Sequence, residues 1–211
     1  MKVLDVKSIF DGIQTILQEI TETQAKISAM QRGVRDLVNQ EEALKGKAGE
    51  SIRSFFDKVH QPFLIFLHQS LTDYTSLLTK IKSDIKAYEP SPDGFIHQGF
   101  IEHEVSRGLN QSLEWTTDVV HQANQAMTKV SDLVSLPPLN ISEFDHSIYA
   151  AKNNIREVVE QLHHLDANQT SALDPISENI ATMESYIDYM DATFKNGAVS
   201  IPNFSVKRRQ E

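Results

Sequence analysis

A seven-residue apolar repeat constrains this chain more than any other feature of its sequence. It runs for four repeats with spacings that alternate between four and three residues, at Ile9, Ile13, Ile16, Ile20, Thr23, Ile27, Met30, Val34 and Leu37. A stripe this narrow is typical of a long helix that packs against another helix. The pattern predicts a helix over residues 5–40, with Asp5 or Ser8 as its N-cap.

A second stripe supplies a partner for the first. It continues at the same spacings and, after one stutter, extends over ten positions: Ile52, Phe56, Val59, Phe63, Phe66, Ser70, Tyr74, Leu77, Ile81 and Ile85. Pro62 interrupts it, and we expect a bend there because proline removes a backbone donor. The two stripes predict an antiparallel hairpin of residues 5–40 against residues 50–88.

The stretch "EEALKGKAGESIRSFF", residues 41–56, joins the two arms and contains two glycines, Gly46 and Gly49. A single glycine with a positive φ is enough to end a helix. A second glycine three residues later also lets another backbone approach closely. The corner is therefore either a plain turn or a turn that doubles as a contact surface.

Three further helices follow. They are expected over residues 95–134, from Ser142 onwards, and from Asp174 with Pro175 at the first helical position. Their stripes are Val105, Leu109, Leu113, Thr116, Val119, Ala123, Met127 and Val130; Phe144, Ile148, Ala151, Ile155, Val158, Leu162 and Leu165; and Leu173, Ile176, Ile180, Met183, Ile187, Met190 and Phe194. The segment "SLPPLNIS" separates the first two of these helices, because Pro137 and Pro138 cannot both continue a helix.

These patterns predict an all-α protein with long, coiled-coil-like helices. We expect an elongated antiparallel helical hairpin at residues 1–88 and a helical bundle at residues 95–195. Residues 196–211 lose the periodicity and are expected to form a linker or tail.

Composition excludes several classes of partner. The formal net charge of −9 disfavours nucleic acid and anionic membrane surfaces, since both require a concentrated basic face. The most apolar run, "PFLIFL", is too short to span a bilayer, so no stable membrane insertion is expected. The start "MKVLDVKSIFDGIQ" has no continuous apolar core and no cleavage site. The protein is expected in the cytoplasm, or to leave by a route that does not read a cleaved signal.

The sequence offers no catalytic, cofactor or metal site. The chain has no cysteine, and its eight histidines lack the spacing that a zinc site requires. Neither a glycine-rich phosphate loop nor a serine in a nucleophile elbow is present. We therefore expect that this chain is not an enzyme.

Several apolar residues are candidates for a partner interface. Trp115, the single tryptophan, is either a core or seam-edge residue or an anchor for a partner. The aromatic patch after the corner is either hairpin core or a groove for a partner helix. With Trp115 the candidates are Ile52, Phe55, Phe56, Phe63 and Phe66.

The segments "MKVLDVKSIFDGI" and "ALKGKAGESIRSFF" together resemble the LXG domain of Gram-positive bacterial toxins. Leu44 and Gly46 stand at the Leu-x-Gly motif, and Gly49 matches the pattern that follows it. The segments "VSLPPLNISEF" and "ALDPISENIATMESYIDYM" are similar to the Bacillus branch of the family. The resemblance covers residues 1 to about 200, with the motif between two long helices as in the WXG helical hairpins.

The resemblance implies a role. LXG domains are N-terminal targeting modules of polymorphic toxins that the type VII (Esx) secretion system exports, and they bind small α-helical targeting or chaperone proteins. The toxic activity, often a nuclease, belongs to a variable C-terminal domain, which we expect to be absent from this chain. By this likeness the protein is cytoplasmic before export and then secreted or placed at the cell surface.

Two functions from different classes remain open at this level. The first is a non-catalytic targeting and adaptor module that buries its apolar stripes against small helical partners. The second is a structural coiled-coil homo-oligomer without an export role. Large exposed apolar stripes would favour the first, whereas stripes that are fully buried within one chain would favour the second.

Overall fold

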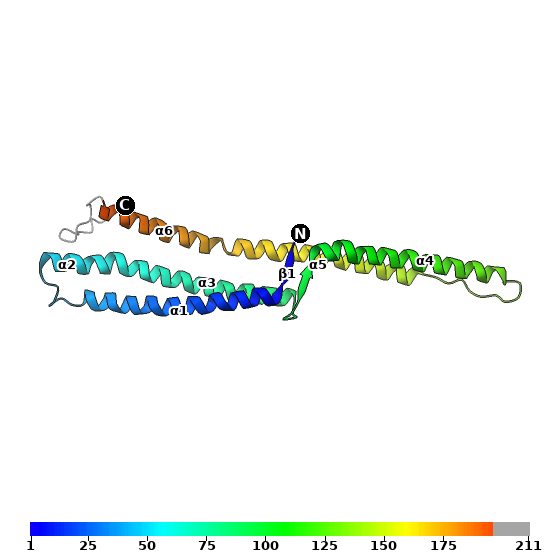
Figure 1. Ribbon diagram of the computed structural model, residues 1–211, viewed down its shortest axis with the longest axis horizontal. Helices are drawn as coiled ribbons and strands as arrows, with labels where there is room; N and C mark the ends of the chain where they lie inside the picture. The colour runs from blue at the N-terminus through cyan, green and yellow to red at the C-terminus, as the bar shows by residue number, and fades with distance from the viewer. Residues whose placement is uncertain (196–211) are drawn as a thin grey trace. The chain divides into compact units, whose positions relative to one another are not determined.

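The structure is a computed structural model that describes residues 1–195 (Figure 1). The expected tail at 196–211 and the side chain of Phe194 lie outside the described residues. Apart from two short strands, all the regular secondary structure of the described part is helical, so the all-α prediction is confirmed. Its α-helices are α1 (Val6–Val38), α2 (Gly46–Phe55), α3 (Gln61–Tyr88), α4 (Ser106–Lys129), α5 (Ser142–Ala172) and α6 (Asp174–Lys195).

Two π-helical turns complete the helical part. The first, η1 (Phe56–His60), joins α2 to α3, and the second, η2 (Phe100–Val105), leads into α4. Pro62 therefore does not interrupt an ordinary helix. It is the second residue of α3, directly after a wider turn in which the Gln61 N–H donates to the carbonyl of Phe56, five residues back. The wider turn departs from the hydrogen-bond pattern of an α-helix and can therefore accommodate Pro62, which has no backbone N–H to donate.

Internal contacts divide the chain into two units. Unit 1 contains residues 1–7 and 85–168, and unit 2 contains residues 8–84 and 169–211. This division differs from the expected split into 1–88 and 95–195, because α6 belongs with the hairpin rather than with α4 and α5.

Unit 2 contains the predicted hairpin. Side-chain contacts fix its antiparallel register: Gln31 Nε2 donates to the Leu64 carbonyl at 3.0 Å, and Gln24 Nε2 donates to Thr72 Oγ1 at 2.9 Å. Its buried apolar residues are Ile13, Ile20 and Ile27 from α1 and Leu64, Leu78 and Ile81 from α3. The predicted stripe of α1 is thus confirmed at Ile13, Ile20 and Ile27, but it is wrong at Thr23 and Met30, which are exposed.

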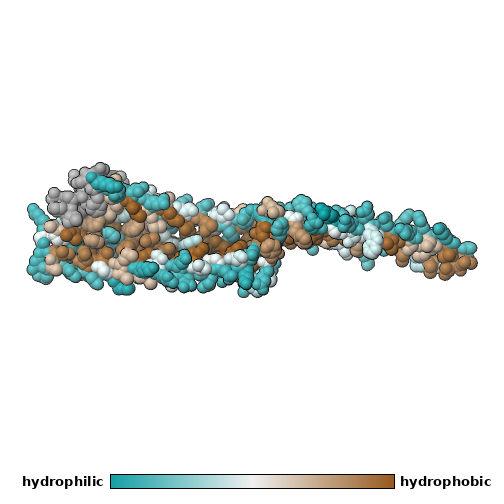
Figure 2. All heavy atoms as spheres, in the orientation of Figure 1, coloured by the Kyte–Doolittle hydropathy of each residue, from teal (hydrophilic) through white to brown (hydrophobic). Residues whose placement is uncertain are grey.

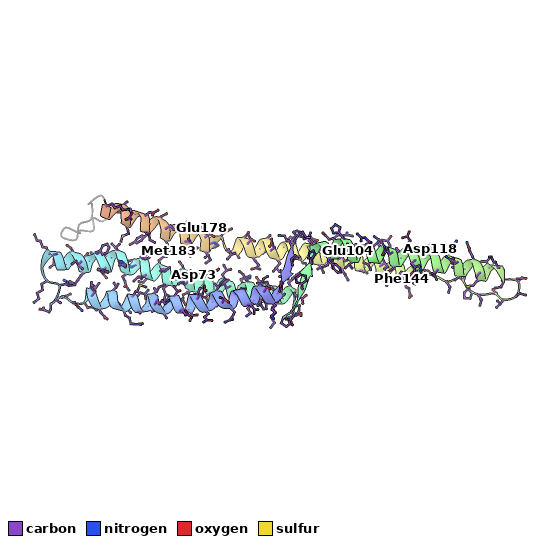
Figure 3. All side chains as sticks on the ribbon, in the orientation of Figure 1. Asp73, Glu104, Asp118, Phe144, Glu178 and Met183 are labelled. Atoms are coloured by element: carbon purple, nitrogen blue, oxygen red, sulfur yellow. The ribbon has the colours of Figure 1, made fainter. Side chains whose placement is uncertain are left out.

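α6 lies along the hairpin in unit 2 and presents only part of its predicted stripe to it. Ile176, Met183 and Met190 are half-buried, and Met183 lies on the side of α6 toward α3 (Figure 3). The other members of the stripe, Leu173, Ile180 and Ile187, are exposed. A single hairpin covers one side of a helix, so the second edge of the stripe remains in solvent.

Unit 1 begins with a feature that the helical patterns did not predict. Strands β1 (Val3–Asp5) and β2 (Phe95–His97) pair antiparallel, with Leu4 opposite Ile96. The start of the predicted helix 95–134 is therefore wrong: residues 95–97 form a strand, and α4 ends at Lys129. Leu4 of β1 and Val6, the first residue of α1, are buried, so the chain at the strand pair contributes two side chains to the core of this unit.

The rest of unit 1 is built on α4 and α5. The Tyr88 hydroxyl donates to the Val158 carbonyl at 2.8 Å, which holds the end of α3 on α5. The loop between α4 and α5 is held by Asn124, whose side chain accepts from the Leu139 N–H at 2.8 Å and donates to the Leu139 carbonyl at 3.0 Å. Hydrophobic side chains cluster over this loop (Figure 2), with Leu133, Val134, Leu136 and Leu139 all exposed.

The Leu-x-Gly corner and the apolar surfaces

The two glycines of the corner are required for different structural reasons. Gly46 begins α2 with φ of +73°, a left-handed conformation that residues with a Cβ rarely adopt. Gly49 lies one turn later and is buried. A Cβ on Gly49 would lie 2.2 Å from the carbonyl oxygen of Leu44, so only glycine fits against that backbone.

The Leu-x-Gly motif therefore describes one local arrangement. The backbone of Leu44 lies directly against Gly49, and the positive φ of Gly46 turns the chain so that α2 begins beside Leu44. The predicted motif residues Leu44, Gly46 and Gly49 lie together at the corner. The close approach of two backbones is what a corner with a second glycine was expected to allow.

Charged side chains surround the corner. Arg53 Nη1 pairs with Glu41 Oε1 at 3.3 Å, and Lys45 pairs with Glu42. The Arg53 side chain is largely buried, whereas both glutamates and Lys45 are exposed. The ion pair of Arg53 ties the corner loop to α2, and the other charges keep the outer surface of the corner polar.

Behind the corner lies a cluster of aromatic rings. The rings of Phe55 and Phe56 meet edge to face at 5.5 Å, and His60 stacks on Phe56 at 5.2 Å. All three are half-buried. The other predicted interface residues of unit 2, Ile52, Phe63 and Phe66, are half-buried as well. The patch is therefore neither a closed core nor a fully open surface.

The turn η1 provides the attachment point for α6. The Tyr186 hydroxyl donates to the Val59 carbonyl at 2.7 Å, and its ring stacks on Phe63 at 5.3 Å with an interplanar angle of 9°. Burial raises the pKa of the Tyr186 hydroxyl above its usual value. An apolar cavity of about 210 Å³ adjoins this contact and is lined by Val59, His60, Phe63, Tyr186, Ile187 and Met190.

Tyr186 was missed by the sequence analysis, although one signal could have found it. Ile176, Met183 and Met190 repeat every seven residues, and Tyr186 lies between the last two at a spacing of three and then four. Its aromatic ring thus belongs to the edge of the stripe that faces the hairpin. The predicted stripe placed Ile187 there instead.

Trp115, the sixth predicted interface residue, lies apart from the others in unit 1. Its side chain is 74% exposed on α4, which contradicts the core alternative for this residue. Val119, one turn further along, is exposed as well, although the predicted stripe placed it in the seam. The five candidates of unit 2 lie along α2, η1 and the start of α3, with Phe55 and Phe56 in ring contact, whereas Trp115 lies on α4 of the other unit.

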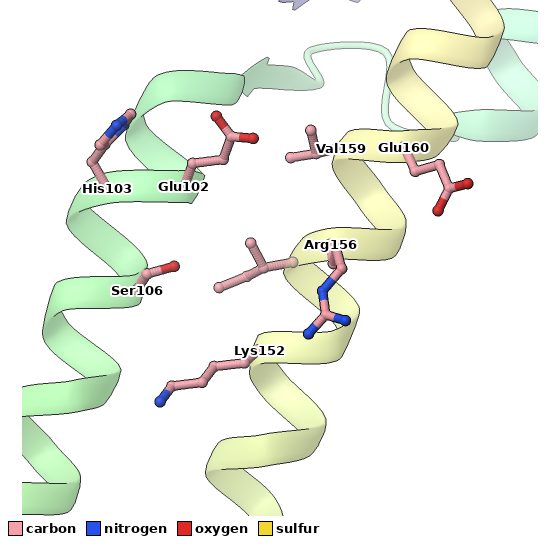
Figure 4. A pocket seen from close by; sticks show the side chains of 8 residues that line it. Glu102, His103, Ser106, Lys152, Arg156, Val159 and Glu160 are labelled. Atoms are coloured by element: carbon pink, nitrogen blue, oxygen red, sulfur yellow. The ribbon is translucent and has the colours of Figure 1, made fainter.

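A groove of about 480 Å³ lies between α5 and the start of α4 in unit 1 (Figure 4). Its lining includes Glu102 and Glu160 as well as Lys152 and Arg156. Arg156 donates to Asn153 of its own helix, and Glu102 accepts from Gln98 of its own segment. The charges of opposite sign are spread along the groove and do not converge on one point, so it has no arrangement for acid–base catalysis.

No group of three or more potential metal ligands occurs among residues 1–195. Within the same residues, no helix is long and apolar enough to cross a membrane. The geometry of this part of the chain is dominated by half-exposed apolar stripes and by a corner whose backbone is defined by Gly46 and Gly49.

Comparison with known proteins agrees with these features. The chain is 28% identical to Toxin YxiD of Bacillus subtilis (strain 168) over 214 residues, an alignment that covers 100% of this chain and 38% of that protein. The chain thus spans well under half the length of this relative. The family model described as the LXG domain of the WXG superfamily matches residues 2–203. That match covers nearly the whole chain, which therefore belongs to the LXG domain family.

Proposed function

We propose that the chain is a non-catalytic targeting and adaptor module of an antibacterial toxin that type VII secretion exports. In this proposal it binds small α-helical targeting or chaperone proteins, and the export machinery reads the resulting complex. The toxic activity belongs to a separate domain of a longer protein. The family and the similarity to a longer protein named as a toxin support this assignment.

One observation carries the partner-binding part of the proposal. Leu173, directly before α6, and Ile180 and Ile187 within it repeat every seven residues and are exposed, although they belong to an unbroken apolar stripe. Exposed Ile and Leu at heptad spacing are the pattern by which helices associate. In a chain that functioned alone, such a stripe would be a liability for aggregation, so a partner is the simplest reason for it.

The corner has its own part in this proposal. Gly46 and Gly49 fix one backbone geometry at the end of the hairpin, with charged side chains on its outer surface. We assign it a recognition role for partners or for the export machinery in addition to its role as a turn. The protein would be made in the cytoplasm and exported without a cleaved signal.

The test is co-expression with the small helical proteins that are encoded beside the gene. The complex would be purified through a tag on this chain, and its mass would be measured by light scattering. A stoichiometric heteromer supports the proposal. A monomer would contradict partner binding, and a stable homo-oligomer would favour the structural alternative.

Export would be tested in the producing cell with the double variant Gly46→Ala/Gly49→Ala. Gly12→Ala is a suitable control, because Gly12 lies in α1 with open space around it. We expect the double variant to retain most of its helix content but to lose export or partner binding. Unchanged export would leave the corner only its role as a turn.

A further inference from the structure

α4 contributes no buried side chain to the core of unit 1. None of its residues from Ser106 to Lys129 is buried, although Leu109, Leu113, Val120 and Met127 on its inner side are half-buried. By contrast, α5 buries Ile148, Val159 and Leu162. Two helices packed side by side leave both flanks of their contact open to water, so a third helix would be needed to close one flank of α4.

One flank of α4 carries a specific apolar surface. Trp115 and Val119 are one helical turn apart and therefore adjacent on the helix, and both are exposed. Gly108, two turns before Trp115, has nothing within 4 Å of the position where a Cβ would lie. A helix that docks here could approach the backbone of α4 closely at Gly108 and cover the indole ring of Trp115.

The charges beside this surface have one sign. Between Arg107 and Lys129 the only charged residues of α4 are Glu114 and Asp118, one residue before Trp115 and three residues after it. Figure 3 labels Asp118 on α4. The two carboxylates are four residues apart, a spacing at which like charges repel on a helix. In the described part of the chain neither carboxylate forms an ion pair. Arg107 of the same helix pairs with Glu104 instead.

We infer that this flank of α4, centred on Trp115 and Val119, binds a helix of a separate small helical protein. The occupant is an amphipathic helix whose apolar stripe is bordered by Lys or Arg, which would pair with Glu114 and Asp118. The inference rests on the proposed function and deepens it, because it gives the partner a surface and a charge pattern. It also separates this surface from the Leu-x-Gly corner, which belongs to the other unit.

The charges decide against two other occupants. A second copy of this chain would bring Glu114 and Asp118 against the same pair of carboxylates, and the net charge of −9 would add to the repulsion. An anionic membrane surface would be repelled for the same reason. A basic-flanked helix both covers the indole ring and relieves the repulsion between the two carboxylates.

Because Trp115 is the single tryptophan of the chain, its fluorescence reports on this surface alone. The purified chain would be titrated with a tryptophan-free form of the small helical protein encoded beside the gene, and Trp emission would be followed. Burial of Trp115 by the partner shifts the emission to shorter wavelength. Complex formation would be measured in parallel by light scattering, which does not depend on the tryptophan.

Three variants sharpen the test. Trp115→Ala should weaken binding at least tenfold, as expected for a central aromatic anchor. Glu114→Lys/Asp118→Lys should also weaken it, and the salt dependence of the wild-type complex should be lost. Tyr149→Ala is the matched control, because Tyr149 is an exposed aromatic residue of α5 in the same unit; this variant should bind as the wild type does.

The outcomes separate the two proposals. If a complex forms but the Trp emission does not shift and Trp115→Ala binds normally, the inference about α4 is overturned and the adaptor function stands. If light scattering detects no complex with the wild-type chain, the partner-binding function itself is overturned. If the chain self-associates through this face instead, Trp115→Ala would abolish the self-association, and the argument from charge would be wrong.

Discussion

The two units join antiparallel helices in different ways. In unit 2 a short corner reverses the chain, and its path is fixed by the positive φ of Gly46 and by the contact of Gly49 with Leu44. In unit 1 the loop between Lys129 and Ser142 is longer and apolar. Its path is held by a side chain, Asn124, which bonds both backbone groups of Leu139.

The helices that these connections join also differ in how many apolar side chains they bury. The hairpin of unit 2 buries three isoleucines of α1 against α3, and α6 adds a third layer of apolar contacts. In unit 1, α4 has only α5 beside it along most of its length and buries nothing. The comparison teaches that a heptad stripe is not sufficient for burial: α1, in a unit with two further long helices, buries three isoleucines, whereas α4 buries none of its stripe.

The sharpest test of this difference is one substitution made in both units. Leu64→Ala removes a buried side chain from unit 2 and should lower the free energy of unfolding by about 3 kcal/mol. Leu113→Ala removes a half-buried side chain of α4 and should cost about 1 kcal/mol. Urea unfolding followed by circular dichroism measures both. Equal losses would mean that α4 is packed as tightly as α3.

The next largest effect is expected at the corner. Gly49→Ala forces the backbone of Leu44 to move and should cost about 2 kcal/mol. Gly46→Ala should cost about 1 kcal/mol, because alanine is strained at a positive φ. Gly108→Ala in α4 is the control: it meets no neighbour and should stabilise the protein by about 0.5 kcal/mol. A destabilising Gly108→Ala would show that α4 has a close neighbour there.

In each unit a tyrosine hydroxyl donates to a backbone carbonyl, Tyr186 to Val59 and Tyr88 to Val158. Tyr186→Phe and Tyr88→Phe should each cost about 1 kcal/mol, since each removes one hydrogen bond. The two residues share no partner and belong to different units, so the double variant should show the sum of the two losses. A double variant that departs from additivity by 1 kcal/mol or more would contradict the independence of the units.

The smallest effect is a dependence on alkaline pH. Burial raises the pKa of the Tyr88 hydroxyl, as it does for Tyr186, so the fold favours the protonated form of both. Their contribution is fully present below about pH 10, the pKa of an unfolded tyrosine, and is lost as the pH rises through the folded-state pKa. Melting curves between pH 8 and pH 11 should show this loss. The double Tyr→Phe variant should lose less stability over the same range.

The sequence predicted the helices well where an apolar stripe runs without interruption over several heptads. The helix of the first arm was expected at residues 5–40 and is found at Val6–Val38, and the helix expected from Asp174 begins at that residue. Ile13, Ile20 and Ile27 lie in the core, as their spacing predicted. Periodicity identifies such helices because it is a property of the local chain.

Other features depend on contacts between distant residues. Residues 3–5 and 95–97 form strands only because they pair with each other across more than ninety residues, and neither segment is long enough to show an alternating pattern. Which edge of the α6 stripe is covered depends on the position of the hairpin, so the exposure of Ile180 and Ile187 could not be predicted from α6 alone. The corner was located from its glycines, but the separate role of each required the backbone of Leu44.

The π-turn at Phe56–His60 makes the number of residues in this stretch matter more than their identity. It holds one residue more than an α-helical turn, as the bond from Gln61 to Phe56 shows. Because one turn absorbs the extra residue, α2 and α3 keep the register of an ordinary helix, and deleting one residue there would restore that helix without rotating α2 relative to α3. The deletion would instead remove the wide turn that presents the Val59 carbonyl to the Tyr186 hydroxyl, so its consequence would fall on the contact between this turn and α6.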